Sequence, residues 1–415
     1  MEKQLKSIND LFPLELIRAI LLRIPIKELA RSKCVSKLWN TLISDPNFAE
    51  SHLHHSLAPT HTYLLIRGYS HAYSVDLNAL LVQEDNNGVD AIGLSLPFNK
   101  KPRSIFYFLG SCRGLVLLQR EQFLILWNPL ISFSKRISYS HIVKAATRLR
   151  ARGSRDFRVR DSHDCVKLFN FLDDALLYGF GYHGSQDEYV VVVAYEGKDG
   201  ENHFDMCCLG SNSWINLDAA LPKPLKMFDW KSKGLFCNGA IHWYTYDCRE
   251  EILIFDLKER TFSKISVPEQ LVPPARYSLV LLGGCLGLYS CDYYSPKTEI
   301  WVMKEYRVQS SWTVYEIPLQ FFRPLSLSVN GDITGSFHTM DNRMRFYVYN
   351  VSGELLKPVQ YGNGVLYGRP TSFIVCADSL MSVPSNITDK MMKRRPSSQT
   401  EKESGQDLSS VGLDS

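Results

Sequence analysis

The chain has 415 residues, of which 45% are apolar, 12% aromatic and 22% charged. This composition is typical of a globular protein with large hydrophobic cores, and the length predicts about two or three domains. The net charge of +4 is too small to predict nucleic-acid binding by itself. We expect neither a membrane anchor nor a secretory signal, because no apolar run approaches ~20 residues and none follows Met1–Lys6. A cytosolic or nuclear location, with reduced cysteines, is therefore expected.

Residues 8–57 have the pattern of a small helical domain with four short helices. Apolar residues recur at a spacing of three to four, and prolines and capping residues separate the runs. Helices of two or three turns are marginal alone, so these should need tertiary packing or a partner. The predicted helices carry Leu14, Ile17 and Leu21; then Ile26–Lys33; then Val35, Leu38, Trp39 and Leu42; and the fourth begins at Asp45-Pro46.

Residues 60–380 change to short strands bounded by turn residues, which predicts an all-β domain. Two hairpin units alternate. In one, the second strand opens with a bulky residue, and these residues, Trp214, Phe262, Trp312 and Leu355, are 48, 50 and 43 residues apart. The other turns at Gly239, Gly284 and Gly331, which are 45 and 47 residues apart. Two hairpins per repeat of this length make one four-stranded propeller blade, so we predict about six blades, with five or seven possible. The alternative is a pair of β-sandwiches.

Other motifs give weaker signals. Gly179–Gly184 matches G-x-G-x-x-G, but a polar turn and a strand follow it, which favours a hairpin over a nucleotide-binding loop. Seven basic residues and one acid lie in Lys144–Arg160, either as a solvated surface insertion or as a clamp for an acidic partner or RNA. Residues 384–415 lack aromatic residues and predict a disordered tail. No spacing predicts a metal, a cofactor or a catalytic group, so we expect a non-catalytic protein.

The N-terminal motifs resemble the F-box, most closely its plant version. They are Phe12-Pro-Leu-Glu-Leu-Ile17, Leu22-Arg-Ile-Pro25-Ile-Lys-Glu-Leu29, Lys33-Cys-Val-Ser-Lys-Leu-Trp39 and Leu42-Ile-Ser-Asp-Pro46-Asn-Phe48. The remainder resembles the plant F-box-associated interaction domain, found in proteins of the F-box/kelch-repeat type and the S-locus F-box-like group. Its matching segments are Gly110-Ser-Cys-Arg-Gly-Leu, Leu126-Trp-Asn-Pro129, Tyr178-Gly-Phe-Gly-Tyr182, Asn238-Gly-Ala-Ile-His-Trp243 and Ile300-Trp-Val-Met-Lys-Glu305.

This resemblance implies a substrate-recognition subunit of a Skp–cullin–F-box ubiquitin ligase. The F-box would dock on a Skp-type adaptor and through it join cullin and RING subunits, while the β domain captures a protein substrate that the sequence leaves unknown. The alternative is an adaptor-bound scaffold or sequestering protein. By the resemblance, the residues expected to form the adaptor contact or the F-box core are Phe12, Pro13, Leu16, Ile17, Leu21, Ile24, Pro25, Leu29, Val35 and Trp39; the sequence alone does not separate contact from core.

Overall fold

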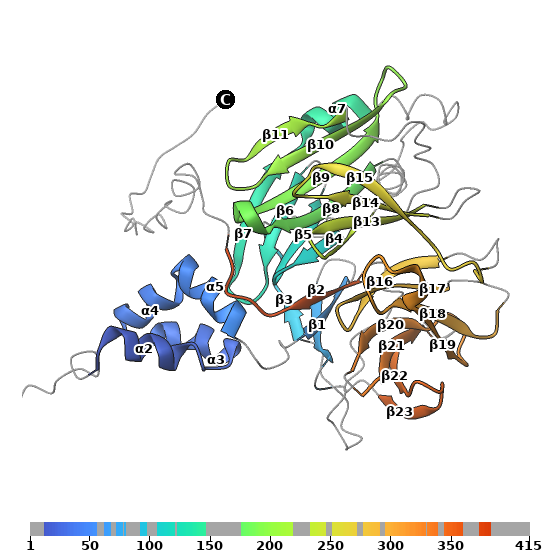
Figure 1. Ribbon diagram of the computed structural model, residues 1–415. Coiled ribbons are helices and arrows are strands. Elements are labelled where there is room, and N and C mark those ends of the chain that lie inside the picture. Colours follow the sequence, from blue (N-terminus) through green and yellow to red (C-terminus); the bar gives the residue numbers. More distant parts are fainter. Residues whose placement is uncertain are drawn as a thin grey trace, which may run out of the picture. The chain divides into compact units, whose positions relative to one another are not determined.

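Figure 1 shows the computed structural model of the chain. The chain divides into two compact units, Met1–Val383 and Pro384–Ser415. The second unit lies outside the described residues, so the tail of residues 384–415 stays a prediction. The structure describes residues 12–55, 62–67, 72–77, 79, 92–97, 106–120, 123–146, 176–218, 233–245, 251–271, 277–290, 295–328, 330–338, 344–359 and 373–382.

Short helices make up the described part of the N-terminal domain, and prolines and caps separate them as predicted. Pro13 and Pro25 stand directly before the first and second helices, where a missing backbone N–H costs nothing. The Ser36 hydroxyl accepts a hydrogen bond from the Trp39 N–H at 3.1 Å, and Asp45 Oδ1 accepts one from the Asn47 N–H at 3.1 Å. The elements are α2 (Leu14–Leu21), α3 (Ile26–Arg31), the 3₁₀ helix η1 (Ser32–Cys34), α4 (Lys37–Ile43) and α5 (Pro46–His55).

Val35 departs from the expected pattern. Its spacing to Trp39 and Leu42 predicted that it would lie on the third helix, but that helix begins two residues later, at Lys37. The reason is Ser36, which adopts an extended conformation (φ −156°, ψ 164°) in order to cap α4. The cap separates Val35 from α4, and Val35 is 59% exposed.

Six four-stranded antiparallel sheets follow, so the β domain is a six-bladed propeller (Figure 1). Both hairpin units and all their turn positions fall where the spacing predicted, and Gly179–Gly184 lies in a hairpin. In blade order, the strands are β24 (Phe373–Ala377), β1 (Thr62–Arg67), β2 (Ala72–Asp76) and β3 (Ile92–Leu94); β4 (Tyr107–Cys112), β5 (Leu115–Arg120), β6 (Phe123–Asn128) and β7 (Phe133–Ser138); β8 (Leu176–His183), β9 (Glu188–Glu196), β10 (Asn202–Cys208) and β11 (Ser213–Asn216); β12 (Leu235–Cys237), β13 (Ala240–Thr245), β14 (Glu251–Asp256) and β15 (Thr261–Ser266); β16 (Tyr277–Leu282), β17 (Cys285–Ser290), β18 (Thr298–Met303) and β19 (Trp312–Ile317); β20 (Arg323–Leu327), β21 (Ile333–His338), β22 (Met344–Tyr349) and β23 (Leu355–Val359).

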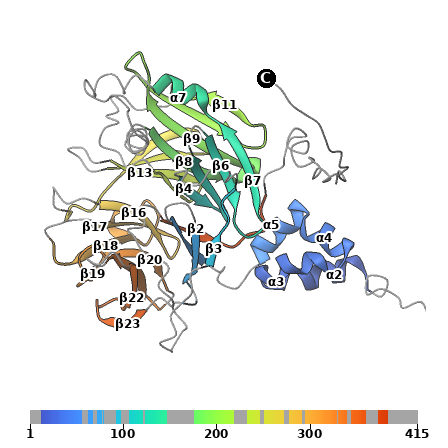
Figure 2. The ribbon, with the colours of Figure 1, turned by 180° about the vertical axis from the view of Figure 1, so that it is seen from behind.

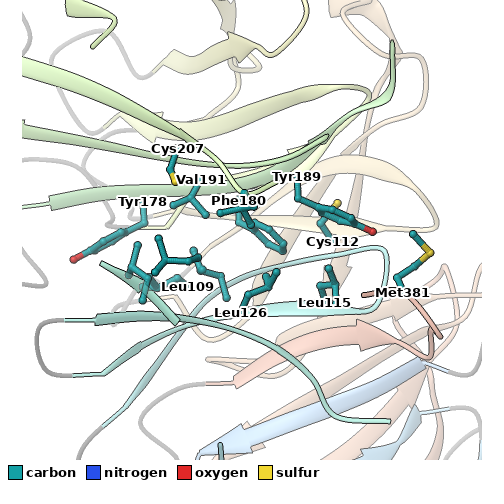
Figure 3. Close-up of a cluster of buried hydrophobic side chains, with 14 of the residues drawn as sticks. Leu109, Cys112, Leu115, Leu126, Tyr178, Phe180, Tyr189, Val191, Cys207 and Met381 are labelled. Carbon is teal, nitrogen blue, oxygen red and sulfur yellow. The ribbon is translucent and has the colours of Figure 1, made fainter. Parts of the chain in front are cut away.

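Central strands of the blades are buried on both faces, which explains their continuous apolar runs. In β9, seven consecutive residues from Tyr189 to Tyr195 are buried. Alternate side chains of a strand point to opposite neighbours, so Val191 joins the core toward β4–β7 while Val192 joins the core toward β12–β15. Figure 3 shows the first of these cores, where Phe180, Tyr189 and Val191 face Cys112, Leu115 and Leu126 across the two sheets.

The propeller is closed by pairing its last strand with its first. β24 pairs antiparallel with β1, and Tyr63 lies opposite Cys376. The first sheet therefore takes one strand from the end of the domain and three from its beginning. The regular spacing of the hairpins did not predict that this first blade needs residues 373–377.

A short helix, α7 (Ser140–Ala146), interrupts the strands, although the sequence indicated no helix within the β domain. It buries Ile142 and Ala146 and lies along β9–β11 in both views (Figures 1 and 2). Seven residues with two buried positions are too few for a periodic signal. Among the described residues, the helices are all too short or too polar to cross a membrane.

Candidate docking surface on the N-terminal helices

Five large apolar side chains remain exposed on or beside the first helices. Leu16 and Ile20 lie one turn apart on α2, at exposed fractions of 44% and 46%. On the same helix Ile17 and Leu21 occupy the buried positions. An eight-residue helix that is apolar on its buried side and also on part of its solvent side is typical of a protein-binding element. We call the five the exposed apolar set: Phe12, Leu14, Leu16, Ile20 and Val35.

The structure separates the ten predicted residues into exposed, half-buried and buried positions. Ile17, Leu21 and Leu29 are buried and belong to the hydrophobic core. Ile24 and Trp39 are half-buried against that core. The exposed members, which remain candidates for direct contact with an adaptor, are Phe12, Pro13, Leu16, Pro25 and Val35.

Leu14 and Ile20 are exposed but were not among the predicted contacts. The exposure of Ile20 could have been predicted from the helical spacing, because Ile20 follows the candidate Leu16 by four residues and so lies on the same face of the helix. Leu14 follows the N-cap proline, in the first turn of α2. Its exposure depends on where the helix begins.

Basic side chains accompany the exposed apolar set. Six lysines and arginines but only two acids lie between residues 12 and 44. Arg23, Arg31 and Lys37 are exposed, whereas burial lowers the pKa of Lys33. An apolar surface with this charge is complementary to a partner surface that combines an apolar groove with carboxylates.

The other side of the helical domain contacts the propeller. α3 contributes Lys27, whose ammonium lies 3.3 Å from Asp76 Oδ2 and 4.8 Å from the centre of the Tyr63 ring. α5 contributes Glu50, which pairs with Arg113 in the β4–β5 turn. The helices thus pack partly on their own β domain, an alternative left open by the sequence, while the exposed apolar set stays uncovered.

A second cluster of ionisable groups lies in the propeller, around the β9–β10 turn. The His203 ring is hydrogen-bonded on both sides, from Nδ1 to Asp218 Oδ2 at 2.7 Å and from Nε2 to Asp199 Oδ2 at 3.1 Å. Two carboxylate acceptors require two donor nitrogens, so this geometry favours the imidazolium. Burial acts to lower the pKa of His203, but Asp218 and Asp199 outweigh it and raise that pKa above its ordinary value.

The described residues offer little for other chemistry. Within the described ranges, no group of three or more His, Cys, Asp or Glu side chains is arranged to hold a metal. His52 Nε2 lies 3.0 Å from the Ile24 carbonyl oxygen, and His54 pairs with Glu50 at 2.8 Å, so both of these histidines have structural partners. Of the basic run Lys144–Arg160, Lys144 lies on α7 and the arginines lie outside the described residues.

Comparisons with known proteins match both parts of the chain. Residues 10–51 match the F-box domain family, and residues 63–362 match the family described as F-box associated beta propeller domain. The F-box/kelch-repeat protein At3g23880 of Arabidopsis thaliana is 27% identical over 336 residues, which cover 76% of this chain and 82% of that protein. The F-box protein CPR1 of the same plant is 27% identical over 328 residues, covering 72% and 71%. A six-bladed β-propeller lectin of Aleuria aurantia aligns with 74% of this chain and 99% of the lectin, at 10% identity and a TM-score of 0.37.

Proposed function

Because the chain belongs to the family of F-box proteins with an F-box associated β-propeller domain, we propose that it is the substrate-recognition subunit of a Skp–cullin–F-box ubiquitin ligase. The F-box docks on a Skp-type adaptor and through it on cullin and RING subunits. The propeller holds a protein substrate for ubiquitination. The cytosol or the nucleus is the proposed location.

The exposed apolar set is the observation that supports the docking step. Leu16 and Ile20 stay in water although Ile17 and Leu21, on the same helix, are 5% and 0% exposed. Covering two such side chains on a partner removes apolar area from water at about 25 cal/mol per Å². A partner that supplies an apolar groove with acidic edges fits both these side chains and the basic residues around them.

On this proposal the chain contributes proximity rather than chemistry. The F-box and the propeller are two binding elements in one polypeptide, so a captured substrate lysine stays near the ubiquitin-charged enzyme that the complex recruits. Holding two reactants together converts a bimolecular step into an effectively unimolecular one. Groups for general acid–base or nucleophilic catalysis are not required of this chain.

The test is co-expression with a Skp-type adaptor, followed by size-exclusion chromatography and titration. We expect a one-to-one complex, and we expect L16A/I20A to weaken it by about a hundredfold or more if each anchor is worth ~1.4–2 kcal/mol. V35A tests whether Val35, the member of the exposed apolar set that follows η1, also contributes to adaptor binding. The matched control is L355A/L356A, because these leucines are 49% and 51% exposed on β23, away from the F-box.

Three outcomes are distinct. Loss of the complex in L16A/I20A but not in the control supports docking through α2. A wild-type chain that is folded and fails to bind the adaptor at micromolar concentration contradicts the proposal. If the complex forms but disruption of the F-box leaves the half-life of a captured protein unchanged, the protein is an adaptor-bound sequestering factor instead.

A further inference from the structure

Arg113 lies where the helical domain meets the propeller, and it is nearly enclosed, with a side chain 14% exposed. Its guanidinium donates a hydrogen bond to Glu50 Oε2 on α5. The same guanidinium lies 3.8 Å from the centre of the Tyr182 ring at the end of β8. Three segments that are far apart in sequence, at residues 50, 113 and 182, therefore meet at one side chain. We call these three residues the Arg113 junction.

Both partners of Arg113 are themselves held in place. Glu50 Oε1 pairs with His54 Nε2 at 2.8 Å, so each carboxylate oxygen has a partner. Burial acts to raise the pKa of Glu50, but Arg113 and His54 outweigh it and hold that pKa below its ordinary value. The Tyr182 hydroxyl donates to Asp187 Oδ1 at 2.6 Å. A planar guanidinium that pairs with a carboxylate and stacks on an aromatic ring has a fixed orientation, whereas a lysine ammonium is a point charge that makes the same two contacts without a fixed plane.

The backbone of Arg113 is fixed as well, because its turn packs against the strand that closes the propeller. Arg113 and Gly114 both have positive φ, at 51° and 78°. A Cβ placed on Gly114 would lie 2.0 Å from the Cβ of Ser379, just past β24. Beside the turn, the Ser111 hydroxyl donates to the Val375 carbonyl oxygen at 2.6 Å. The arginine that reaches α5 thus projects from the point where the ring of blades is joined.

Apolar contacts and a second ion pair surround this junction. Phe48 and Ala49 of α5 share one buried core with Leu115 of β5 and with Met381. Lys27 of α3 provides the other ion pair, to Asp76 at the end of β2. The Arg113 guanidinium is the less exposed of the two cations, at 14% against 36% for Lys27, and it is planar, so we expect it to contribute more to fixing the direction.

We propose that Arg113 is a positioning residue that holds the F-box at one orientation on the propeller. The Gly110-Ser-Cys-Arg-Gly-Leu segment then has a physical role. Its Ser111 and Gly114 pack the turn against the closing strand, and its Arg113 connects that fixed turn to α5. The inference of a fixed orientation does not depend on the proposed function, but the consequence for ubiquitin transfer rests on it. In a ubiquitin ligase receptor, a fixed orientation keeps the substrate at a defined distance and direction from the transfer site.

The experiment measures the distance between the two domains in the full chain by pulsed electron resonance. Spin-label amino acids are placed at the exposed Lys37 on α4 and Lys258 in the β14–β15 turn. We expect one narrow distance distribution in the wild type, a clearly broadened one in R113A, and further broadening in R113A/K27A. R113K keeps the charge but not the planar fork, so it should fall between wild type and R113A.

Two controls keep the proposal open to refutation. R136A removes an arginine that stacks on Phe123 within a single blade, and should leave the distance unchanged. E50Q weakens the same pair from the F-box side without touching the β4–β5 turn, and it replaces R113A if that variant does not fold. A broad distribution in the wild type, or a narrow wild-type distance in both R113A/K27A and E50Q, overturns the proposal.

Adaptor affinity is measured on the same variants. It should remain within about twofold of wild type, because the exposed apolar set lies apart from the junction. Failure of the wild type to bind the adaptor would contradict the proposed function while leaving the positioning role intact, so the two failures are distinguishable.

Discussion

Replacing Gly114 with alanine should destabilise the propeller by opening its closure. Two costs combine. A non-glycine residue at φ 78° is strained by roughly 1–2 kcal/mol. The new methyl group also overlaps Ser379 Cβ, at 2.0 Å, and meets the backbone oxygen of Ala377 and nitrogen of Ser379 at 3.0 Å each, an overpacking that typically costs about 1–3 kcal/mol. We expect a total loss of about 2–5 kcal/mol.

Gly239 provides the matched control for this prediction. It occupies the corresponding β12–β13 turn with φ 74°, and a Cβ there would meet nothing within 4 Å. G239A should therefore cost only the backbone strain, about 1–2 kcal/mol, partly offset by the reduced entropy of the unfolded chain. The difference between G114A and G239A isolates the contact with the closing segment.

The assay is urea unfolding of both variants and the wild type, followed by tryptophan fluorescence. Adding S379G to G114A should recover part of the loss, because it removes the nearest overlapping atom, and the two substitutions should be strongly non-additive. Equal losses in G114A and G239A, or additive behaviour of G114A and S379G, would refute the argument that this turn packs against the closing strand.

Three further predictions concern side chains of the propeller domain. H203Q should be most destabilised relative to wild type at about pH 6 and below, because the native state favours the imidazolium form of His203. The difference in unfolding free energy should shrink as the pH rises through the raised pKa of His203. Unfolding free energies measured between about pH 5.5 and 9 check this prediction. Burial raises the pKa of Asp378 to about 7, so the native state disfavours its charged form. The stability of D378N relative to wild type should therefore increase as the pH rises from about 5 to 8. A difference in unfolding free energy that does not depend on pH would contradict this. W243F should lower the free energy of unfolding by about 1–3 kcal/mol, because the buried indole donates a hydrogen bond to the Tyr178 carbonyl oxygen of the neighbouring blade at 3.0 Å. Chemical denaturation measures this loss. A loss below about 0.5 kcal/mol would show that the hydrogen bond contributes little.

Local patterns predicted the repeating part of the fold well. Each blade contains the same two hairpins, so Gly239, Gly284 and Gly331 recur at nearly equal spacing, and Trp214, Phe262 and Trp312 mark the outer strands. These positions are set by turn chemistry and by burial within one sheet, and both act over a few residues. That is why about six blades could be predicted before any pairing was known.

Features set by distant contacts could not be predicted in this way. The strand Phe373–Ala377 has the composition of any buried strand, and nothing local specifies that it pairs with Thr62–Ile66. Likewise Arg113 is one of many surface-type residues in the sequence, and its burial follows only from α5 and β8 being brought beside it. Leu16 and Ile17 are adjacent and similar in chemistry, so the separation of exposed from buried positions required the direction of each side chain on α2.

The pairing of β24 with β1 has a consequence for how the protein is made on the ribosome. The last described helix of the N-terminal domain ends at His55, so that domain is complete early in synthesis, whereas the first blade lacks a strand until Ala377 has left the ribosome. Five blades are thus translated while the ring is open, and contacts with such a long sequence separation form slowly. During that interval the nascent chain carries a finished F-box and an unpaired β1 edge. A stop codon before residue 373 would leave that edge permanently exposed, whereas one after residue 383 would leave every described strand in place.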